Sequence, residues 1–245
     1  MHENELWLTA FFNEHLSGLA NSILSVFQIT AKDPAKPWEN WIVMELLVVA
    51  ILLVLVAVVR SGFSVERPGK LQHLFEVLYS FLKNSTDEIG IHHGGKYVSY
   101  FGTLFVFILF MNLLGIVPTF ESPTMTPAVP CGLALCTFAY YNFMGFREHG
   151  IVRYLAHFAG PIPLLAPLMV PIELVSHLAR PLSLTIRLFA NMFAGEQVTT
   201  AFLGLTYLVA PAVFMGLHLF VAFLQAYIFT LLTMIYVSIA TGHEH

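Results

Sequence analysis

Long runs of apolar residues separated by short polar segments dominate the chain and predict membrane-crossing helices. Three runs, at about 41–60, 98–118 and 129–146, have the length that a helix needs to cross a hydrocarbon layer of about 30 Å. Two further runs, at about 171–200 and 209–240, are longer than a perpendicular crossing requires. We therefore expect an all-α polytopic membrane protein with five membrane-crossing helices, the last two forming a long, strongly tilted hairpin.

Two other segments have apolar residues at helical spacing but too many polar residues to cross. The segment at about 68–90 predicts an amphipathic helix in the membrane interface. Residues 1–37 predict an N-terminal amphipathic surface segment, and residues 38–245 a single membrane domain. The prolines of "GPIPLLAPLMVP" are expected to exclude a regular helix before about Pro171.

Composition agrees with this pattern and excludes several classes of protein. Hydrophobic residues make up 57% and charged residues 11% of the 245 positions, whereas soluble domains have about a quarter charged residues. The net charge of −4 and the scattered basic residues argue against nucleic-acid binding. Basic residues follow the first and third spans, so we expect those loops to be cytoplasmic, with the N-terminus outside and the C-terminus inside. The acidic start lacks the basic region of a signal peptide, and we expect a bacterial plasma (inner) membrane protein.

The cysteines and loop histidines do not predict a metal site. Cys131 and Cys136 point to different faces of one helix, so we expect packing by small apolar side chains and no disulfide. The histidines of "GIHHGGK" and "GHEH" lack further ligands and are expected in solvated loops. No cofactor is expected.

Arg187 lies in the middle of the fourth apolar run, where a charge in lipid costs about 3 kcal/mol or more. Glu196 falls on the opposite helix face about 13 Å away, and Glu173 shares the face of Arg187 but lies about 21 Å back. Neither carboxylate reaches the guanidinium along one straight helix. We therefore expect Arg187 to pair with a carboxylate of another chain.

Other polar residues of the last two runs share faces with one another. Ser183, Arg187 and Asn191 repeat every four residues, and His218 and Gln225 are seven apart. An antiparallel hairpin would bring Glu196 beside His218, and acids, imidazoles and amides along one seam are the components of a proton path. Two alternatives remain open: Glu196 and His218 only stabilise the hairpin as a satisfied pair, or the amides only bridge helices.

A second polar group lies toward the cytoplasmic end of the fourth run. It comprises Glu173, Ser176, His177 and Arg180. These residues are either functional or solvated anchors of the helix end.

Two segments, "ELVSHLARPLSLTIRLFANMFAGE" (173–196) and "HLFVAFLQAYIFTLLTMIYVSIA" (218–240), closely resemble subunit a of the F-type ATP synthase membrane sector. The stretches "PGKLQHLFE" and "FMNLLGIVP" agree, and the resemblance begins at about residue 38. It implies a stator subunit that provides two offset proton half channels and is not catalytic alone. Arg187 would be the essential arginine opposite a carboxylate of the c-subunit ring, and b-type peripheral stalk subunits would be further partners.

The resemblance also implies which residues line each half channel. The outer one would contain Asn191, Glu196, His218 and Gln225. The inner one would contain Glu173, Ser176, His177, Arg180 and Ser183.

Two positions depart from that family's usual pattern. Ala190 stands where glycine is usual, and it keeps the side chain small. The turn "TFESPTMTPAVPCGLAL" lacks the usual Asp or Asn residues, which leaves Glu121 as its acid. The alternative function is a secondary proton-coupled transporter, which requires a substrate site at mid-membrane and a carboxylate for Arg187 in the same chain.

Overall fold

The computed structural model describes residues 5–26, 33–64, 69–91, 94–117, 120–151, 154, 166–203 and 209–242. Helices account for the regular structure of these residues: α1 (Trp7–Val26), α2 (Asn40–Ser61), α3 (Lys70–Glu88), α4 (Val98–Leu114), α5 (Ala128–His149), α7 (Ala166–Leu203) and α8 (Val209–Thr241), with short 3-10 helices η1 (Gly94–Lys96) and η2 (Pro123–Met125). The prediction of an all-helical chain is confirmed for this part. The loop histidines at 92, 93, 243 and 245 lie outside the described residues.

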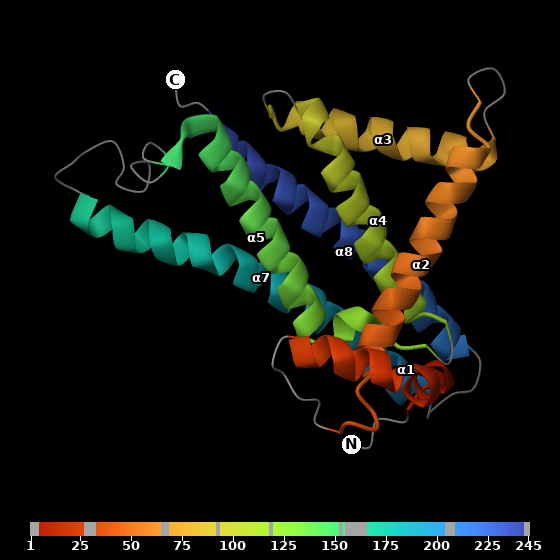
Figure 1. Cartoon of the computed structure of the whole chain (residues 1–245). Coiled ribbons are helices and arrows are strands. Elements are labelled where there is room, and N and C mark those ends of the chain that lie inside the picture. Colours follow the sequence, from red (N-terminus) through yellow and green to blue (C-terminus); the bar gives the residue numbers. More distant parts are fainter. Residues whose placement is uncertain are drawn as a thin grey trace.

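The helices form an open bundle with one helix across each end (Figure 1). Helices α2, α4 and α5 run between the two ends, and α7 and α8 run obliquely across them. Helix α3 lies across the end where α2 finishes and α4 begins, and α1 lies across the opposite end beside η2. Helices α1 and α3, which lie in the two segments predicted to be amphipathic, are therefore the helices that lie across the ends of the bundle.

Helix α8 is central, because it packs against α4, α5 and α7. Its inward face is almost completely buried and combines small and large apolar side chains, such as Ala222, Ala226, Phe229 and Met234. Small residues at these positions let neighbouring helices approach closely. The core therefore forms where α4, α5, α7 and α8 meet, and α2 adds Val43, Met44 and Val48 to it.

Several polar side chains within this core make hydrogen bonds to the backbone or to one another. The hydroxyls of Thr230 and Thr233 each donate to the backbone carbonyl one turn back, at 2.9 Å. Asn112 of α4 is fully buried, donates to the carbonyl of Ala222 at 3.3 Å and accepts from the Thr124 hydroxyl at 2.9 Å. This asparagine joins α4 to α8 and to the turn containing η2.

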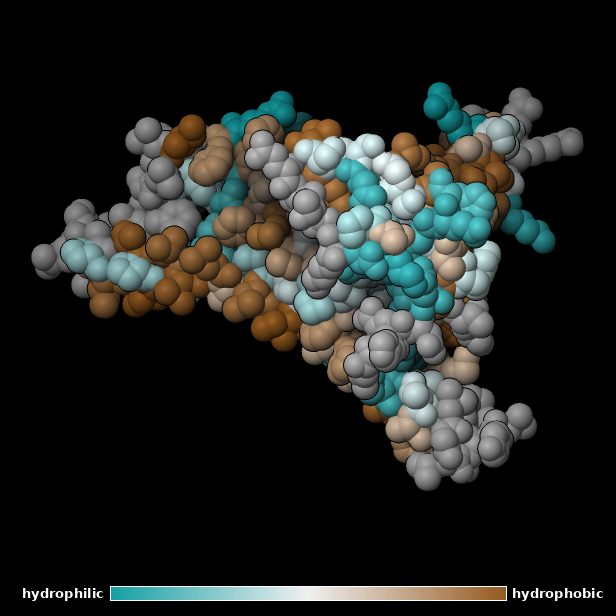
Figure 2. Space-filling model, turned by 60° about the horizontal axis from the view of Figure 1, so that its bottom comes forward, coloured by the Kyte–Doolittle hydropathy of each residue, from teal (hydrophilic) through white to brown (hydrophobic). Residues whose placement is uncertain are grey.

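Two helices of the described part are long and apolar enough to cross a membrane: α2 and, within α8, Val213–Thr241. Helix α4 is equally apolar but shorter. Much of α2 is exposed and apolar, including Leu53 at 66% and Val54 at 63% exposure. Figure 2 shows hydrophobic side chains along the arm at its left, where α7 extends in Figure 1. Such surfaces suit contact with lipid or with other membrane subunits, and five crossings remain a prediction.

The structure corrects two expectations. Helix α7 begins at Ala166 and contains Pro171 and Pro181 in its interior, so the prolines do not delay the helix to about residue 171. Helices in lipid tolerate proline because neighbouring helices, hydroxyl side chains or water can satisfy the freed backbone groups. Cys131 and Cys136 are free, as predicted, but both are exposed on α5 rather than packed inside the chain.

Candidate functional site

Helices α7 and α8 form an antiparallel pair that brings most of the predicted polar residues to one seam. The amide of Asn191 on α7 donates to Oε1 of Gln225 on α8 at 2.9 Å. One turn further along α7, Gly195 faces the imidazole of His218, and a Cβ at that glycine would lie 3.5 Å from the ring Cε1. The partner number on α8 falls as the number on α7 rises, which defines the antiparallel register.

Buried nitrogens along this seam lack protein partners. Among the described residues, Nε2 of His218 and Nε2 of Gln225 are buried without a hydrogen bond. An unpaired buried donor or acceptor costs about 1–3 kcal/mol, so such groups generally mark water or a functional partner. The seam is therefore suited to hold water or to exchange protons.

Glu196 lies beside the His218 contact, because it directly follows Gly195 in α7. Within the described residues no hydrogen bond or ion pair joins the Glu196 carboxylate to His218. The carboxylate instead lies within electrostatic range of Glu121, in the turn before η2. Glu121 also accepts a hydrogen bond from the side chain of Asn40 at 3.3 Å. The turn before η2 therefore adds Glu121, a second acid, to the polar residues around Glu196.

Arg187 is half-buried at the boundary between two faces of α7. Leu184 and Leu188 beside it are buried in the core, whereas Leu182 and Ile186 are exposed on the outer face. Within the described part of the chain, no carboxylate lies within ion-pair distance of the Arg187 guanidinium.

Arg180, two turns earlier, has a different environment. Its guanidinium contacts Oε1 of Glu173 at 3.6 Å and lies 5.3 Å from the ring centre of Tyr236 on α8. The ring face attracts the cation, and the ion pair holds it there. The two basic residues of α7 thus differ in whether the chain supplies a counterion.

His177 belongs to a polar cluster that sequence reasoning did not find. The imidazole Nε2 lies 2.9 Å from Oδ1 of Asn142, which also accepts a hydrogen bond from the Tyr154 hydroxyl at 2.9 Å. The Tyr141 hydroxyl lies 3.5 Å from the same imidazole nitrogen. A cavity of about 450 Å³ adjoins His177, Asn142 and Tyr154. Only the position of Asn142 in an apolar span would have indicated it.

Ser176 and Ser183 are exposed on α7, and neither makes a side-chain hydrogen bond among the described residues. The predicted residues therefore separate into two groups along α7. One group lies at the end where α5 finishes, and the other at the end where α1 and η2 lie (Figure 1). Arg187 falls between them.

The described residues contain no cluster of three or more potential metal ligands. The structure shows an all-helical arrangement in the described residues, with two helices apolar enough to cross a membrane and ionisable side chains on the packed pair α7 and α8.

Comparison with known sequences identifies the family. The profile of the ATP synthase A chain family matches residues 42–238. Similar relatives are the proteins named ATP synthase subunit a of Solibacter usitatus, 61% identical over 96% of this chain and 100% of the relative, and of Koribacter versatilis, 46% identical over 99% of both. A third, from Sulfurihydrogenibium sp., is 40% identical over 84% of this chain and 100% of its own length.

The chain belongs to the ATP synthase A chain family. The resemblance found in the sequence is confirmed, and the chain is one subunit of a larger complex rather than an enzyme acting alone.

Proposed function

We propose that this chain is the stator subunit that couples proton flow across the membrane to rotation of a ring of c subunits. Arg187 faces the ring, and the two polar groups on either side of it form two offset half channels. The peripheral stalk, built on b-type subunits, holds the chain still against the turning ring. The membrane would be a bacterial plasma membrane, crossed five times.

The observation that carries the proposal is the unpaired guanidinium of Arg187. A permanent cation in lipid needs a counterion, and no described carboxylate of this chain reaches it. The face of α7 beside it is exposed and apolar, with Val175, Leu178, Leu182, Ile186 and Phe193 at helical spacing. A rotating partner that brings one carboxylate at a time to this face would pair with the arginine transiently.

The outer half channel is supported by the seam of Asn191, Glu196, His218 and Gln225, with Glu121 at its mouth. Two unpaired buried nitrogens there would bind water that conducts protons. The inner half channel is supported by Glu173, Ser176, His177, Arg180 and Ser183, together with the cavity beside His177. In the sequence of α7, Arg187 lies between the two groups, which supports this division.

Position would then decide the protonation of each ring carboxyl. A carboxyl facing lipid stays neutral because desolvation disfavours its charge, whereas beside a guanidinium the charged form is favoured. A carboxyl that reaches Arg187 releases its proton to one half channel and is reloaded from the other. Because a guanidinium cannot lose its proton in a protein, Arg187 also prevents protons from passing directly between the channels.

Replacing Arg187 by alanine tests this function. We expect Arg187→Ala to abolish ATP synthesis driven by a proton gradient in membrane vesicles, although the complex still assembles. Arg147→Ala is the matched control, because Arg147 is exposed at the end of α5 and should leave synthesis unchanged. Normal coupled synthesis by the Arg187→Ala complex would contradict the proposal.

A secondary transporter is the other function considered from the sequence. It requires a carboxylate that pairs with Arg187 inside the same chain, and the described residues supply none. The comparisons also place the chain in a family of ATP synthase subunits. No observation favours the transporter.

A further inference from the structure

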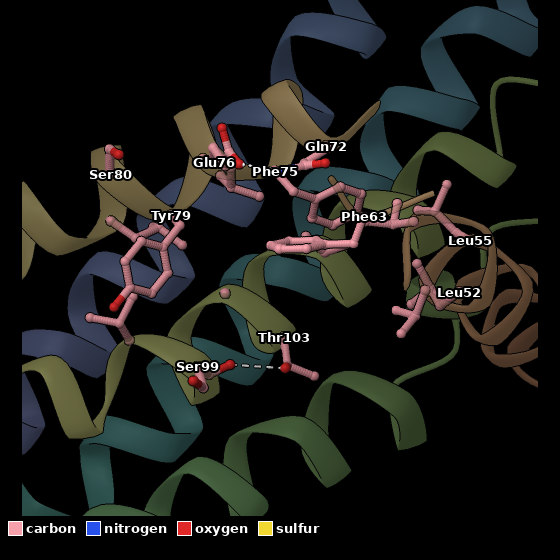
Figure 3. A pocket seen from close by; sticks show the side chains of 17 residues that line it. Leu52, Leu55, Phe63, Gln72, Phe75, Glu76, Tyr79, Ser80, Ser99 and Thr103 are labelled. Carbon is pink, nitrogen blue, oxygen red and sulfur yellow. Dashed lines mark hydrogen bonds between the residues drawn. The ribbon is translucent and has the colours of Figure 1, made fainter. Parts of the chain in front are cut away.

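A second cavity lies away from Arg187, between α2, α3 and α4 (Figure 3). Its volume is about 500 Å³. Phe63, which follows α2, and Phe75 of α3 reach into the space between α3 and α4, and Leu52 and Leu55 of α2 close one side. None of the predicted proton-path residues lines it.

The walls of this cavity are apolar over most of their extent. Leu52, Val56 and Val59 recur at helical spacing and form one face of α2. On α4, the Thr103 hydroxyl donates to the carbonyl of Ser99 at 2.9 Å, so its donor is already used. Gly102 gives the cavity depth, because a Cβ there would meet only Leu82, at 3.6 Å. Such walls favour an apolar occupant over water.

One end of the cavity is polar. Gln72 accepts a hydrogen bond from the backbone amide of Ser64 and donates to its carbonyl, both at 3.1 Å, which fixes the chain after α2 onto α3. Gln72 also donates to Oε1 of Glu76 at 2.8 Å, and Figure 3 shows this pair above the aromatic rings. Among the described residues, no cation lies within ion-pair distance of the Glu76 carboxylate.

The size of the cavity selects between two apolar occupants. A methylene has about the volume of a water molecule, ~30 Å³, so the space holds about sixteen carbons, close to one acyl chain. A helix about 10–12 Å wide fills roughly 120–170 Å³ per residue, so the same space would hold only about three or four residues of helix. The volume therefore matches one acyl chain more closely than a crossing helix of a partner subunit.

We propose that this cavity binds one phospholipid whose acyl chain fills the space between α2, α3 and α4 and whose headgroup ammonium pairs with Glu76. Arg60, in the last turn of α2, and Lys70, two residues before Gln72 in α3, are exposed and suit the headgroup phosphate. The lipid seals α3 against α2 and α4. This site is independent of the proton path.

The test uses the complete purified complex in nanodiscs. Phosphatidylethanolamine and phosphatidylglycerol, each with a photoreactive diazirine in one acyl chain, are cross-linked by light, and labelled peptides are identified by mass spectrometry. We expect the phosphatidylethanolamine probe to label α2 and α4 at the cavity. Gly102→Leu fills the cavity and should lose this labelling. Gly132→Leu on α5, where nothing lies within 4 Å of an added Cβ, should retain it.

The headgroup is tested separately by Glu76→Gln. We expect the wild-type complex to prefer the ethanolamine probe at the cavity, and Glu76→Gln to lose this preference while the acyl chain still labels. Three results would overturn the proposal: equal cavity labelling in wild type and Gly102→Leu, no preference for ethanolamine in the wild type, or cross-linking of the cavity to another polypeptide in place of lipid.

Discussion

Arg180 and Arg187 lie seven residues apart on α7, yet the protein treats their charges differently. Arg180 has a carboxylate at 3.6 Å and an aromatic ring below it, both within the chain. Arg187 has no such partner in the described residues and borders an exposed apolar face. A fixed ion pair would hold an arginine in place, whereas an unpaired one remains available to a moving carboxylate.

Gly195 offers a test of the seam at the residue scale. A Cβ there would lie 3.5–3.7 Å from the His218 ring, which is ordinary contact, so Gly195→Ala should be tolerated. Gly195→Leu would need the space of the imidazole and should displace His218. We expect Gly195→Leu to slow proton flux severalfold without uncoupling, measured by dye quenching in inverted vesicles.

Gly132→Leu is the control for this change, since an added Cβ at Gly132 meets nothing within 4 Å. Gly132→Leu should leave the proton flux at the level of the unmodified complex. Unchanged flux in Gly195→Leu would show that the position of His218 does not limit proton movement.

At the scale of elements, α1 is held to the segment before α2 by polar contacts in addition to the packing of Phe12 against Trp38. The amide of Asn13 donates to Glu5 at 2.7 Å and its oxygen accepts from the backbone amide of Trp38 at 2.9 Å. The Lys36 ammonium pairs with the Glu5 carboxylate. These hydrogen bonds lower the pKa of Glu5 below its ordinary value of 4.5, first through Lys36 and then through Asn13.

The sign of the shift sets the pH dependence of this contact. A carboxyl whose pKa is lowered by folding stabilises the folded form above its ordinary pKa and loses that contribution as the pH falls through the lowered value. We therefore expect protection of the Trp38 amide against hydrogen exchange to be steady above about pH 4.5. It should decrease slightly below that pH, because Lys36 is largely exposed and solvent screens the pair.

Lys36→Gln separates the charge from the remaining hydrogen bonds. We expect this variant to show lower protection of Trp38 at neutral pH and a weaker dependence on acid, as followed by hydrogen exchange and mass spectrometry. If protection of the Trp38 amide falls with acid in the same way in Lys36→Gln and in the unmodified protein, the Lys36–Glu5 pair does not cause the pH dependence.

For the whole molecule, the arrangement of helices separates two ends. Helix α3, the end of α5 and the end of α8 share one end, whereas α1 and η2 occupy the other (Figure 1). Arg60 in the last turn of α2, Lys70 at the start of α3 and Arg147 in the last turn of α5 lie at the first end, whereas Lys36 lies beside α1 at the other. By the positive-inside rule the first end is predicted to be cytoplasmic.

Single cysteines would establish this orientation. In a background with Cys131 and Cys136 replaced by alanine, we expect Ser61→Cys to react with a membrane-impermeant thiol reagent only from the cytoplasmic side. Ala128→Cys, at the start of α5, should react only from the opposite side, and both positions are exposed. Labelling of both cysteines from the same side would contradict the predicted crossings.

The sequence by itself determined that the protein is helical, approximately where most helices begin and end, and which family the chain belongs to. Apolar runs and helical periodicity are local properties of the chain, so the bounds of α2 lie within one residue, and those of α5 within three, of the apolar runs. The isolated charge of Arg187 was equally visible, because the cost of a cation in lipid does not depend on the fold. The start of α7 was predicted wrongly, since proline has a smaller effect in a packed membrane helix than the pattern suggested.

Only the tertiary structure decided which polar groups meet. The contacts of Asn191 with Gln225, Gly195 with His218, and His177 with Asn142 join residues 23 to 35 positions apart, and they depend on how helices pack. The contact of Arg180 with Tyr236 and the approach of Glu121 to Glu196 also depend on how the helices pack. Periodicity assigns a residue to a face of its helix, but the register between two helices is set by the fit of side chains along their whole contact.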